Sequence, residues 1–408
     1  MANTNPLFSL FNHHEEDIEI VLSEETSNLP EIPSNLVNKF GSIKFMLGRS
    51  GSCLILSEDD ELFVTVADGL IVNDGFNPTW KRFTIGFKNP NERIVHVSAS
   101  YHACVLILQS GSQFNNISTR VFVGYVNGER ADRDFGEEVT EYSDKEENLL
   151  DGDENSNIIW YHLKDFELNN GEYVNYSSCA AFACSFITSH GRLFACGSNQ
   201  FAELAQPTTG FRTGQIIPKV NQCCLDPLNE CENPFFIKTV NGDHNIIGIT
   251  KDHNIFYCGY DMEFGGKDLE MMRQLKRVVS LEYDEYFIDI CASYYRRLYL
   301  TNDTFFGNIM DKIGETVVSC RMCGSASKYY LLINNYKIFS LEEDSFTLKL
   351  MHTVTNPRPF KTLQIATDES GFVVAYWKCS TESKNLMNQK ENLKKRVYDN
   401  LLSDIRFN

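Results

Sequence analysis

Apolar and polar positions along the chain recur as pairs of short apolar runs separated by tight turns. The clearest unit, Cys179–Leu204, reads CAAFACSFITSHGRLFACGSNQFAEL, with a His190-Gly191 turn between its two runs. A second unit, Val240–Gly266, repeats this order. When Thr188 is aligned with Thr250, the turns and the closing glycines of the two units coincide. This spacing predicts two copies of a β-hairpin with a two-residue turn.

Five weaker copies extend the pattern over most of the chain. The segment left over after a hairpin holds a further strand-like run in several units, such as Phe83–Ile85 and Ile158–His162. Four short strands in each unit are typical of a β-propeller blade. One step, from Ser293 to Gly324, is only 31 residues (324 minus 293), so we expect either an incomplete blade there or a misplaced blade boundary. The seven units begin at Gly48, Ala99, Ala180, Gly242, Ser293, Gly324 and Thr367.

Two of the repeats resemble those of a known protein family. ITSHGRLFACGSNQFAEL and ITKDHNIFYCGYDMEFGG resemble the repeat of the regulator of chromosome condensation family, in outline over Gly48–Trp377 and specifically over Cys179–Gly266. The resemblance implies a seven-bladed propeller in which an N-terminal strand pairs with the last blade. This chain departs from the family pattern at the opening histidine and at the tryptophan before the closing glycine; those positions hold Ala183, Asn245, Cys196 and Cys258.

The predicted fold is therefore all-β, a degenerate seven-bladed propeller over residues 17–378. Residues 1–16 are expected to form a flexible segment, and the alternating run Asp17–Leu22 to supply the closing strand. Between Glu382 and Arg406, apolar residues fall seven, four, four and four positions apart, which predicts an amphipathic helix within 379–408. That helix is expected to pack on the rim of the propeller or to dock a partner.

Residues 128–156 form an acidic insertion in the second blade. The segment holds twelve acidic and three basic residues, a net charge of −9, between the predicted strands 121–126 and 158–162. Dense like charge favours a solvated linker. The alternative is an arm that recruits a basic partner, and the glutamates expected to bind it are Glu137, Glu138, Glu141, Glu146 and Glu147.

Charge and composition exclude some classes of protein. The chain carries 55 Asp and Glu against 37 Lys and Arg, a net charge of −18, which disfavours direct binding to nucleic acid or anionic membranes. No apolar stretch reaches the length of a membrane span, and no targeting segment is visible. Thirteen cysteines scattered through apolar runs favour a reducing compartment. We expect a monomeric intracellular protein, cytoplasmic or nuclear, without membrane insertion.

Motifs for chemistry are scarce. The sequence has no phosphate-binding glycine loop and no spacing that nominates a catalytic triad. His102 stands at the opening position of the second repeat and is expected to be structural. A C-x-x-C pair, Cys320 and Cys323, has the spacing of half a zinc site, and a predicted loop holds three further thiols, Cys223, Cys224 and Cys231. A closed tetrahedral zinc site needs a second pair at similar spacing, which the sequence lacks. We therefore expect all five to be ordinary core or loop thiols. No catalytic residue, cofactor or metal is expected.

The function expected from these features is a non-enzymatic scaffold or regulatory propeller that binds other proteins. The alternative is a guanine-nucleotide exchange factor for a small GTPase. In the resembled family, a hairpin that projects from one blade contacts a small GTPase, but the acidic residues that serve exchange there match no positions in this sequence. The expected partners are thus other proteins, including a small GTPase or a basic protein.

Overall fold

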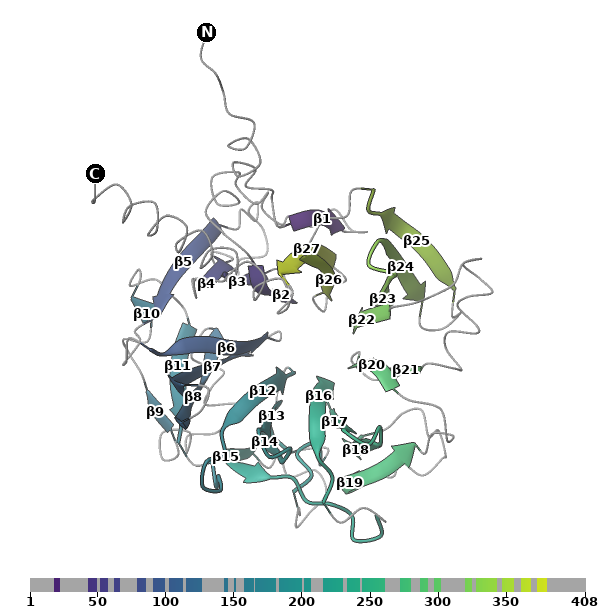
Figure 1. Ribbon diagram of the computed structural model, residues 1–408. Helices are drawn as coiled ribbons and strands as arrows, with labels where there is room; N and C mark the ends of the chain where they lie inside the picture. The colour runs from purple at the N-terminus through teal and green to yellow at the C-terminus, as the bar shows by residue number, and fades with distance from the viewer. Residues whose placement is uncertain are drawn as a thin grey trace, which may run out of the picture.

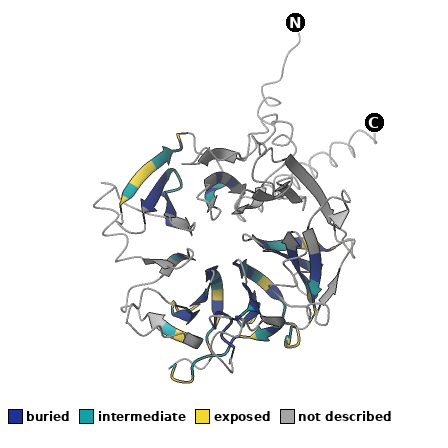
Figure 2. Cartoon of the chain, turned by 180° about the vertical axis from the view of Figure 1, so that it is seen from behind, coloured by how far each residue is buried: buried dark blue, intermediate teal, exposed yellow. Residues whose placement is uncertain are grey.

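The computed structural model of the protein is a ring of seven antiparallel β-sheets, the blades of a propeller (Figure 1). It describes residues 18–22, 43–49, 52–57, 62–66, 79–85, 91–99, 103–112, 115–126, 143–145, 150–151, 158–164, 166–180, 183–199, 202–206, 216–229, 233–242, 244–260, 272–279, 287–292, 297–301, 320–324, 328–342, 347–355, 361–367 and 373–379. The described side chains lie mainly in blades 2, 3, 4 and 6 (Figure 2).

The blades follow one another along the chain. Blades 1 and 2 contain β2 (Ile43–Arg49), β3 (Ser52–Ser57), β4 (Leu62–Val66) and β5 (Thr79–Ile85), then β6 (Arg93–Ala99), β7 (Ala103–Ser112), β8 (Asn115–Val126) and β11 (Ile158–Leu163). Blades 3 and 4 contain β12 (Val174–Cys179), β13 (Ala183–Thr188), β14 (Leu193–Ser198) and β15 (Ile216–Gln222), then β16 (Phe236–Gly242), β17 (Asn245–Thr250), β18 (Ile255–Gly259) and β19 (Met272–Val279).

The remaining blades confirm the predicted closure of the ring, whereas the predicted incomplete blade stays a prediction, because residues 302–319 lie outside the described residues. Blade 5 has two strands within the described residues, β20 (Phe287–Ala292) and β21 (Arg297–Thr301), and blade 6 has β22 (Cys320–Gly324), β23 (Lys328–Ile333), β24 (Lys337–Glu342) and β25 (Leu348–Thr353). In blade 7, β26 (Lys361–Thr367) pairs with β27 (Val373–Cys379). The N-terminal strand β1 (Ile18–Leu22) pairs with β27, Val21 opposite Val374, and closes the ring.

The aligned hairpins of blades 3 and 4 share one register, but their turns are longer than predicted. Phe186 pairs with Phe194 in blade 3, and Gly248 pairs with Phe256 in blade 4. Each turn is a three-residue loop, not a two-residue turn: the Gly191 N–H donates to the Thr188 carbonyl, and the Thr188 N–H donates to the Arg192 carbonyl. This is a type I turn closed by a left-handed residue.

Backbone conformation explains why the turns and closing glycines coincide. The third loop residue has φ of 72° at Gly191 and 58° at His253, and the closing residue has φ of 115° at Gly197 and 105° at Gly259. At Gly259 a Cβ atom would lie 2.3 Å from the His244 carbonyl oxygen, so the position admits only glycine.

Blades pack against each other through both of their faces. Val174, Phe186 and Phe194 of blade 3 share a buried cluster with Val105 and Val123 of blade 2. The opposite face of blade 3, which includes Ile187 and Leu193, packs with Phe236, Ile246 and Phe256 of blade 4. Phe194 and Phe256 thus both face the preceding blade, as the repeat alignment predicts. The core of the protein is the series of these seams between blades.

The acidic insertion enters and leaves blade 2 as predicted. β8 and β11 flank it and pair antiparallel, with Val126 opposite Ile158. Two short stretches inside it are strands: β9 (Ser143–Lys145) pairs with β11, and β10 (Leu150–Asp151) pairs with β5 of blade 1. The insertion therefore adds a strand to the outer edge of each of the first two blades.

Some predictions lie outside the described residues. These are the flexible segment 1–16, the amphipathic helix between 382 and 406, and the histidine at position 102. Among the residues that are described, none forms a helix with the length and apolar character that crossing a bilayer demands.

Replacing Phe256 with alanine tests the seam between blades 3 and 4. Its ring is fully buried, so Phe256→Ala should lower the free energy of unfolding by about 3–5 kcal/mol, measured by urea denaturation. Leu228→Ala, at a side chain that is 87% exposed, is the matched control and should change stability by less than about 0.5 kcal/mol. A loss below about 1 kcal/mol at Phe256 would contradict the register.

Candidate protein-binding face

One face of the ring carries the segments that cross from the outer strand of one blade to the inner strand of the next. In the best described part these are residues 164–173 and 223–235, together with the turns 189–191 and 251–253; we call this side the crossover face. The Ser189 N–H donates to the Tyr173 carbonyl (2.8 Å), and the Lys251 N–H donates to the Phe235 carbonyl (2.7 Å). Each crossover is thereby tied to the turn of the blade that it enters.

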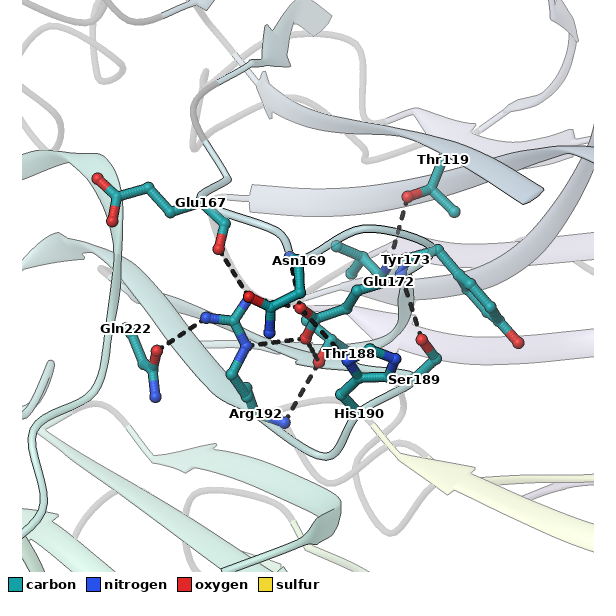
Figure 3. Close-up of polar contacts among 11 residues, drawn as sticks. Thr119, Glu167, Asn169, Glu172, Tyr173, Thr188, Ser189, His190, Arg192 and Gln222 are labelled. Atoms are coloured by element: carbon teal, nitrogen blue, oxygen red, sulfur yellow. Dashed lines mark hydrogen bonds and ion pairs between the residues drawn. The ribbon is translucent and has the colours of Figure 1, made fainter. Parts of the chain in front are cut away.

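Glu172 is the centre of a polar network on this face (Figure 3). Its side chain is fully buried and lies at the end of crossover 164–173. The carboxylate accepts hydrogen bonds from both the Nε and the Nη2 of Arg192, from the Thr188 hydroxyl and from the Asn169 N–H (2.8 Å). His190 Nδ1 lies 3.8 Å from the same carboxylate. The network joins the crossover to the β13–β14 turn.

The environment of Glu172 determines its charge. Burial alone would raise the pKa of the carboxyl group, but the hydrogen bonds from Arg192, Thr188 and Asn169 outweigh burial and lower the pKa from 4.5 to about 2. Glu172 is consequently ionised at neutral pH and forms a buried ion pair with Arg192. It is a structural anchor and not a proton donor.

Arg192 extends the network to two further segments. Its Nη2 donates to the Glu167 carbonyl (2.7 Å), its Nη1 donates to Gln222 Oε1 (3.0 Å), and its guanidinium lies 4.9 Å from the ring centre of Phe194. The same side chain therefore contacts the crossover, the end of β15 and the seam with blade 2.

Blade 2 repeats this arrangement. Arg120 donates from Nε and Nη2 to Glu92 at 2.7 and 2.6 Å, and its guanidinium lies 4.9 Å from the Phe122 ring. In both blades the glutamate stands two residues before the first buried residue of the inner strand, and the arginine stands two residues before a phenylalanine of the third strand. The sequence-based prediction did not include this pair, although the repeated Arg-x-Phe is a signal for it.

Blade 4 replaces the ion pair with apolar contacts. Pro234 and Asn254 occupy the equivalent positions, and the neighbouring Phe235 lies over Gly191, where a Cβ atom would be 2.5 Å from the ring. The Phe236 N–H donates to the Gly191 carbonyl (2.8 Å) and fixes this position. Phe235 is 41% exposed, and Lys251 Nζ lies 6.0 Å from its ring centre. An aromatic side chain thus lies exposed between two turns.

The first half of crossover 223–235 is held against the outer strand of blade 4. The Asp226 N–H donates to the Leu275 carbonyl, and the Leu275 N–H donates to the Cys224 carbonyl (2.9 and 2.8 Å). The side chain of Asn229 donates to the Leu275 carbonyl and accepts from the Arg277 N–H, as a paired strand residue would. At the turn, the Leu228 N–H donates to Asp226 Oδ1 (2.9 Å). These bonds hold the 87% exposed side chain of Leu228 on an ordered turn.

The inner strands carry a second set of polar contacts, around the axis of the ring. His96, Tyr176, Lys238 and Asp289 stand at equivalent positions beside a β-bulge in blades 2 to 5. The rings of His96 and Tyr176 lie 4.5 Å apart, and Lys238 pairs with Asp289. Burial lowers the pKa of Lys238, but the charge of Asp289, its hydrogen bond and the neighbouring Tyr176 and Cys291 together outweigh burial and raise the pKa, so this lysine stays protonated and bound.

The cysteines that could have formed a zinc site are not assembled into one within the described part of the structure. Cys223 is buried between blades 3 and 4, whereas Cys320 lies on β22 of blade 6. Among the described side chains, no group of three or more His, Cys, Asp or Glu residues is placed to hold a metal ion. The side chains of Cys231 and Cys323 lie outside this set, as do all five glutamates predicted to bind a partner.

The geometry of Glu172 generates a pH prediction. Because its pKa is lower in the folded protein than its ordinary value, ionised Glu172 stabilises the fold; the contribution is complete above about pH 4.5 and is lost as the pH falls toward 2. Glu172→Gln should therefore cost about 3 kcal/mol at neutral pH, and the difference from wild type should narrow in acid, where protonated Glu172 resembles glutamine.

The control for this prediction lies on the same crossover. Glu167 has a side chain that is 81% exposed and pairs with Lys219 at 3.3 Å, so Glu167→Gln should change stability by less than about 0.5 kcal/mol at any pH. Chemical denaturation between neutral and acidic pH measures both variants. A constant difference between wild type and Glu172→Gln would show that the carboxylate is not the stabilising group.

Comparisons with known proteins give structural likeness only. No protein-family profile and no curated protein matches the chain. Yeast RCC1 (Prp20), solved bound to Kap60, is 11% identical, with a TM-score of 0.49 and 86% of this chain and 82% of that one covered. Human WBSCR16 is 12% identical, with a TM-score of 0.43 over 80% of this chain and 70% of that one. The β-propeller domain of Cps50 (Swd1) from Myceliophteria thermophila is 10% identical, with a TM-score of 0.32 and coverage of 90% and 100%.

Proposed function

We propose that this protein is a non-enzymatic propeller that binds other proteins through its crossover face, and that it is a divergent member of the regulator of chromosome condensation family. Membership is supported by the seven repeated hairpins, by the left-handed closing residues of blades 3 and 4, and by the N-terminal strand that pairs with the last blade. The side chains of the crossover face support the binding function.

The observation that carries the proposal is an exposed apolar surface on an ordered base. Of the four large apolar side chains that are exposed in the described structure, three lie within residues 228–237. Leu228 and Phe235 belong to crossover 223–235, and Ile237 follows at the start of β16. Backbone and side-chain hydrogen bonds fix the crossover at several points, so a partner would meet these side chains at little cost in ordering.

The ionisable groups support a binding role more than catalysis. Each described group whose pKa departs from its ordinary value is shifted away from neutrality. The pKa of Glu172 falls, whereas burial raises the pKa of the Tyr176, Cys196 and Cys258 side chains, to about 12 for Cys196. Groups that keep one protonation state around neutral pH are poor general acids and bases.

The alternative function, nucleotide exchange on a small GTPase, would use the same kind of surface. An exchange factor stabilises the nucleotide-free GTPase, so it must accelerate nucleotide release, whereas a scaffold need not. Release of a labelled guanine nucleotide from a panel of small GTPases, with and without the protein, separates the two functions.

The binding surface can be tested with two leucines of similar chemistry. Leu228→Ser should weaken capture of protein partners at least tenfold, because it removes the most exposed apolar side chain of the crossover face. Leu350→Ser is the matched control: Leu350 is 50% exposed but belongs to β25, a strand of blade 6 (Figure 1), so binding should be unchanged. Partners are identified by affinity capture and mass spectrometry, and their dissociation constants by calorimetry. Equal binding by both variants would overturn the assignment of this face.

The acidic insertion is proposed as a second contact, for basic partners. Exposed charges are screened over about 8 Å at physiological ionic strength, so binding that depends on the insertion should weaken as salt is added. Replacing its glutamates with glutamine should weaken binding of a basic partner, flatten the salt dependence and leave the melting temperature unchanged. If the affinity for a basic partner and its salt dependence are both unchanged, the insertion is a solvated linker and not a binding arm. The glutamates to replace are Glu137, Glu138, Glu141, Glu146 and Glu147.

A further inference from the structure

Four buried cysteines lie near one another at the seam between blades 2 and 3, and three of them, Cys179, Cys184 and Cys196, belong to one buried cluster. Cys184 of β13 is fully buried and interacts with Cys179 of β12, Cys196 of β14 and Cys104 of β7. Among these, Cys179 interacts most directly with Cys184, because the two thiols share a hydrogen bond. The fold thus places two oxidisable thiols side by side on neighbouring strands, in a part of the protein that the proposed function does not use.

The strand register suits a covalent bond between these two thiols. Cys179 is directly opposite Cys184, and the Ala180 N–H donates to the Ala183 carbonyl in the next pair. Hydrogen-bonded and non-hydrogen-bonded pairs alternate in antiparallel sheets, so Cys179 and Cys184 form a non-hydrogen-bonded pair. The Cα atoms of such pairs are about 4.5 Å apart, within the range of about 4.4–6.8 Å that disulfides require.

The neighbouring pair of thiols is less well placed. Cys184 is also opposite Cys196, but the Thr188 N–H donates to the Arg192 carbonyl at the end of the same hairpin, and the register runs unshifted between. Pairs alternate along the hairpin, so Cys184 and Cys196 form a hydrogen-bonded pair. Its Cα separation of about 5.5 Å is also within the range for disulfides, but the side chains of a hydrogen-bonded pair lie further from each other than those of a non-hydrogen-bonded pair. The two possible bonds of Cys184 are therefore distinguishable.

We propose that Cys179 and Cys184 form a redox-active dithiol that a low-molecular-weight disulfide oxidises to a cross-strand disulfide. The thiolate of Cys179 attacks the small disulfide and releases one small thiol, giving a mixed disulfide. The thiolate of Cys184 then attacks the Cys179 sulfur and releases the second. Two protons leave the protein thiols, two electrons pass to the small disulfide, and one S–S bond replaces another.

Burial sets the order and the rate of these steps. Cys179 lies at the end of β12 and is 9% exposed, whereas Cys184 is inaccessible, so the first attack belongs to Cys179. The interaction with Cys179 and burial both raise the pKa of Cys184 well above its ordinary value, which makes its thiolate scarce and the second step slow. The bond would join the inner strand of blade 3 to β13, at the end opposite the crossover face, so it does not depend on the proposed function.

The test uses the folded full-length protein and glutathione disulfide as the oxidant. After incubation at mildly alkaline pH and quenching in acid, free thiols are alkylated, and the peptides are identified by mass spectrometry. We expect one intrachain bond between Cys179 and Cys184, reversed by dithiothreitol, in protein whose circular dichroism spectrum is unchanged. Cys196→Ser should form the same bond, whereas Cys179→Ser should form none.

Two outcomes would overturn the proposal. One is a bond from Cys184 to Cys196 or to any other cysteine in place of Cys179. The other is complete alkylation of Cys179 and Cys184 after the incubation, including in a sample refolded in the presence of glutathione disulfide. The refolded sample removes slow access to the buried thiols as an explanation, because both thiols are exposed to the oxidant before the seam closes.

Discussion

Every blade of this ring has two apolar faces, and only its neighbours can cover them. In blade 3 the strands β13 and β14 are buried almost throughout, with Phe186 and Phe194 turned toward blade 2 and Ile187 and Leu193 turned toward blade 4. Alternate residues of one strand therefore serve different seams. This explains why the second and third strands read as continuous apolar runs, whereas a sheet with one face in water would alternate.

Because the seams are shared, polar groups at their edges must be satisfied across blade boundaries. The hydroxyls of Ser98 and Ser177 meet at 2.8 Å between blades 2 and 3, and those of Ser185 and Thr239 meet at 3.0 Å between blades 3 and 4. At the crossover face, the buried carboxylate of Glu172 is satisfied within blade 3 and the crossover that enters it. A buried carboxylate is tolerable only with such a full set of donors, and Arg192, Thr188 and Asn169 provide it.

The fold was largely predictable from the sequence because its determinants are local and repeated. The left-handed residues at the turns, the closing glycines and the apolar runs recur at fixed spacing, and the closing strand shows the alternation of a β-strand. The length of the turn was not predictable in this way: His190-Gly191 suits a two-residue turn, but the bond from the Thr188 N–H to the Arg192 carbonyl makes the loop three residues long.

The candidate site was harder to predict, for a physical reason. Glu172 and Arg192 are twenty residues apart, and their pairing depends on a crossover returning to the turn of the blade that it enters. Leu228 gives no signal in the sequence at all, because an exposed leucine and a buried one look alike. Its exposure depends on Asn229, whose side chain makes the two hydrogen bonds to β19 that the backbone of a paired strand would make, and so holds the turn against blade 4.

The contrast between crossovers 164–173 and 223–235 connects the fold to the function. The first ends in Glu172, whose ion pair anchors the segment, so its apolar residues Phe166 and Leu168 pack inward against the seam. The second has Pro234 at the equivalent position and no such ion pair, and its backbone bonds to Gly191 and Leu275 hold it in place. Because these bonds and the side chains of Asp226 and Asn229 fix the crossover, Leu228 and Phe235 are not needed to anchor it and can stay exposed. In this propeller, the repeat that lacks the ion pair is therefore the one that exposes the apolar side chains proposed to bind partners.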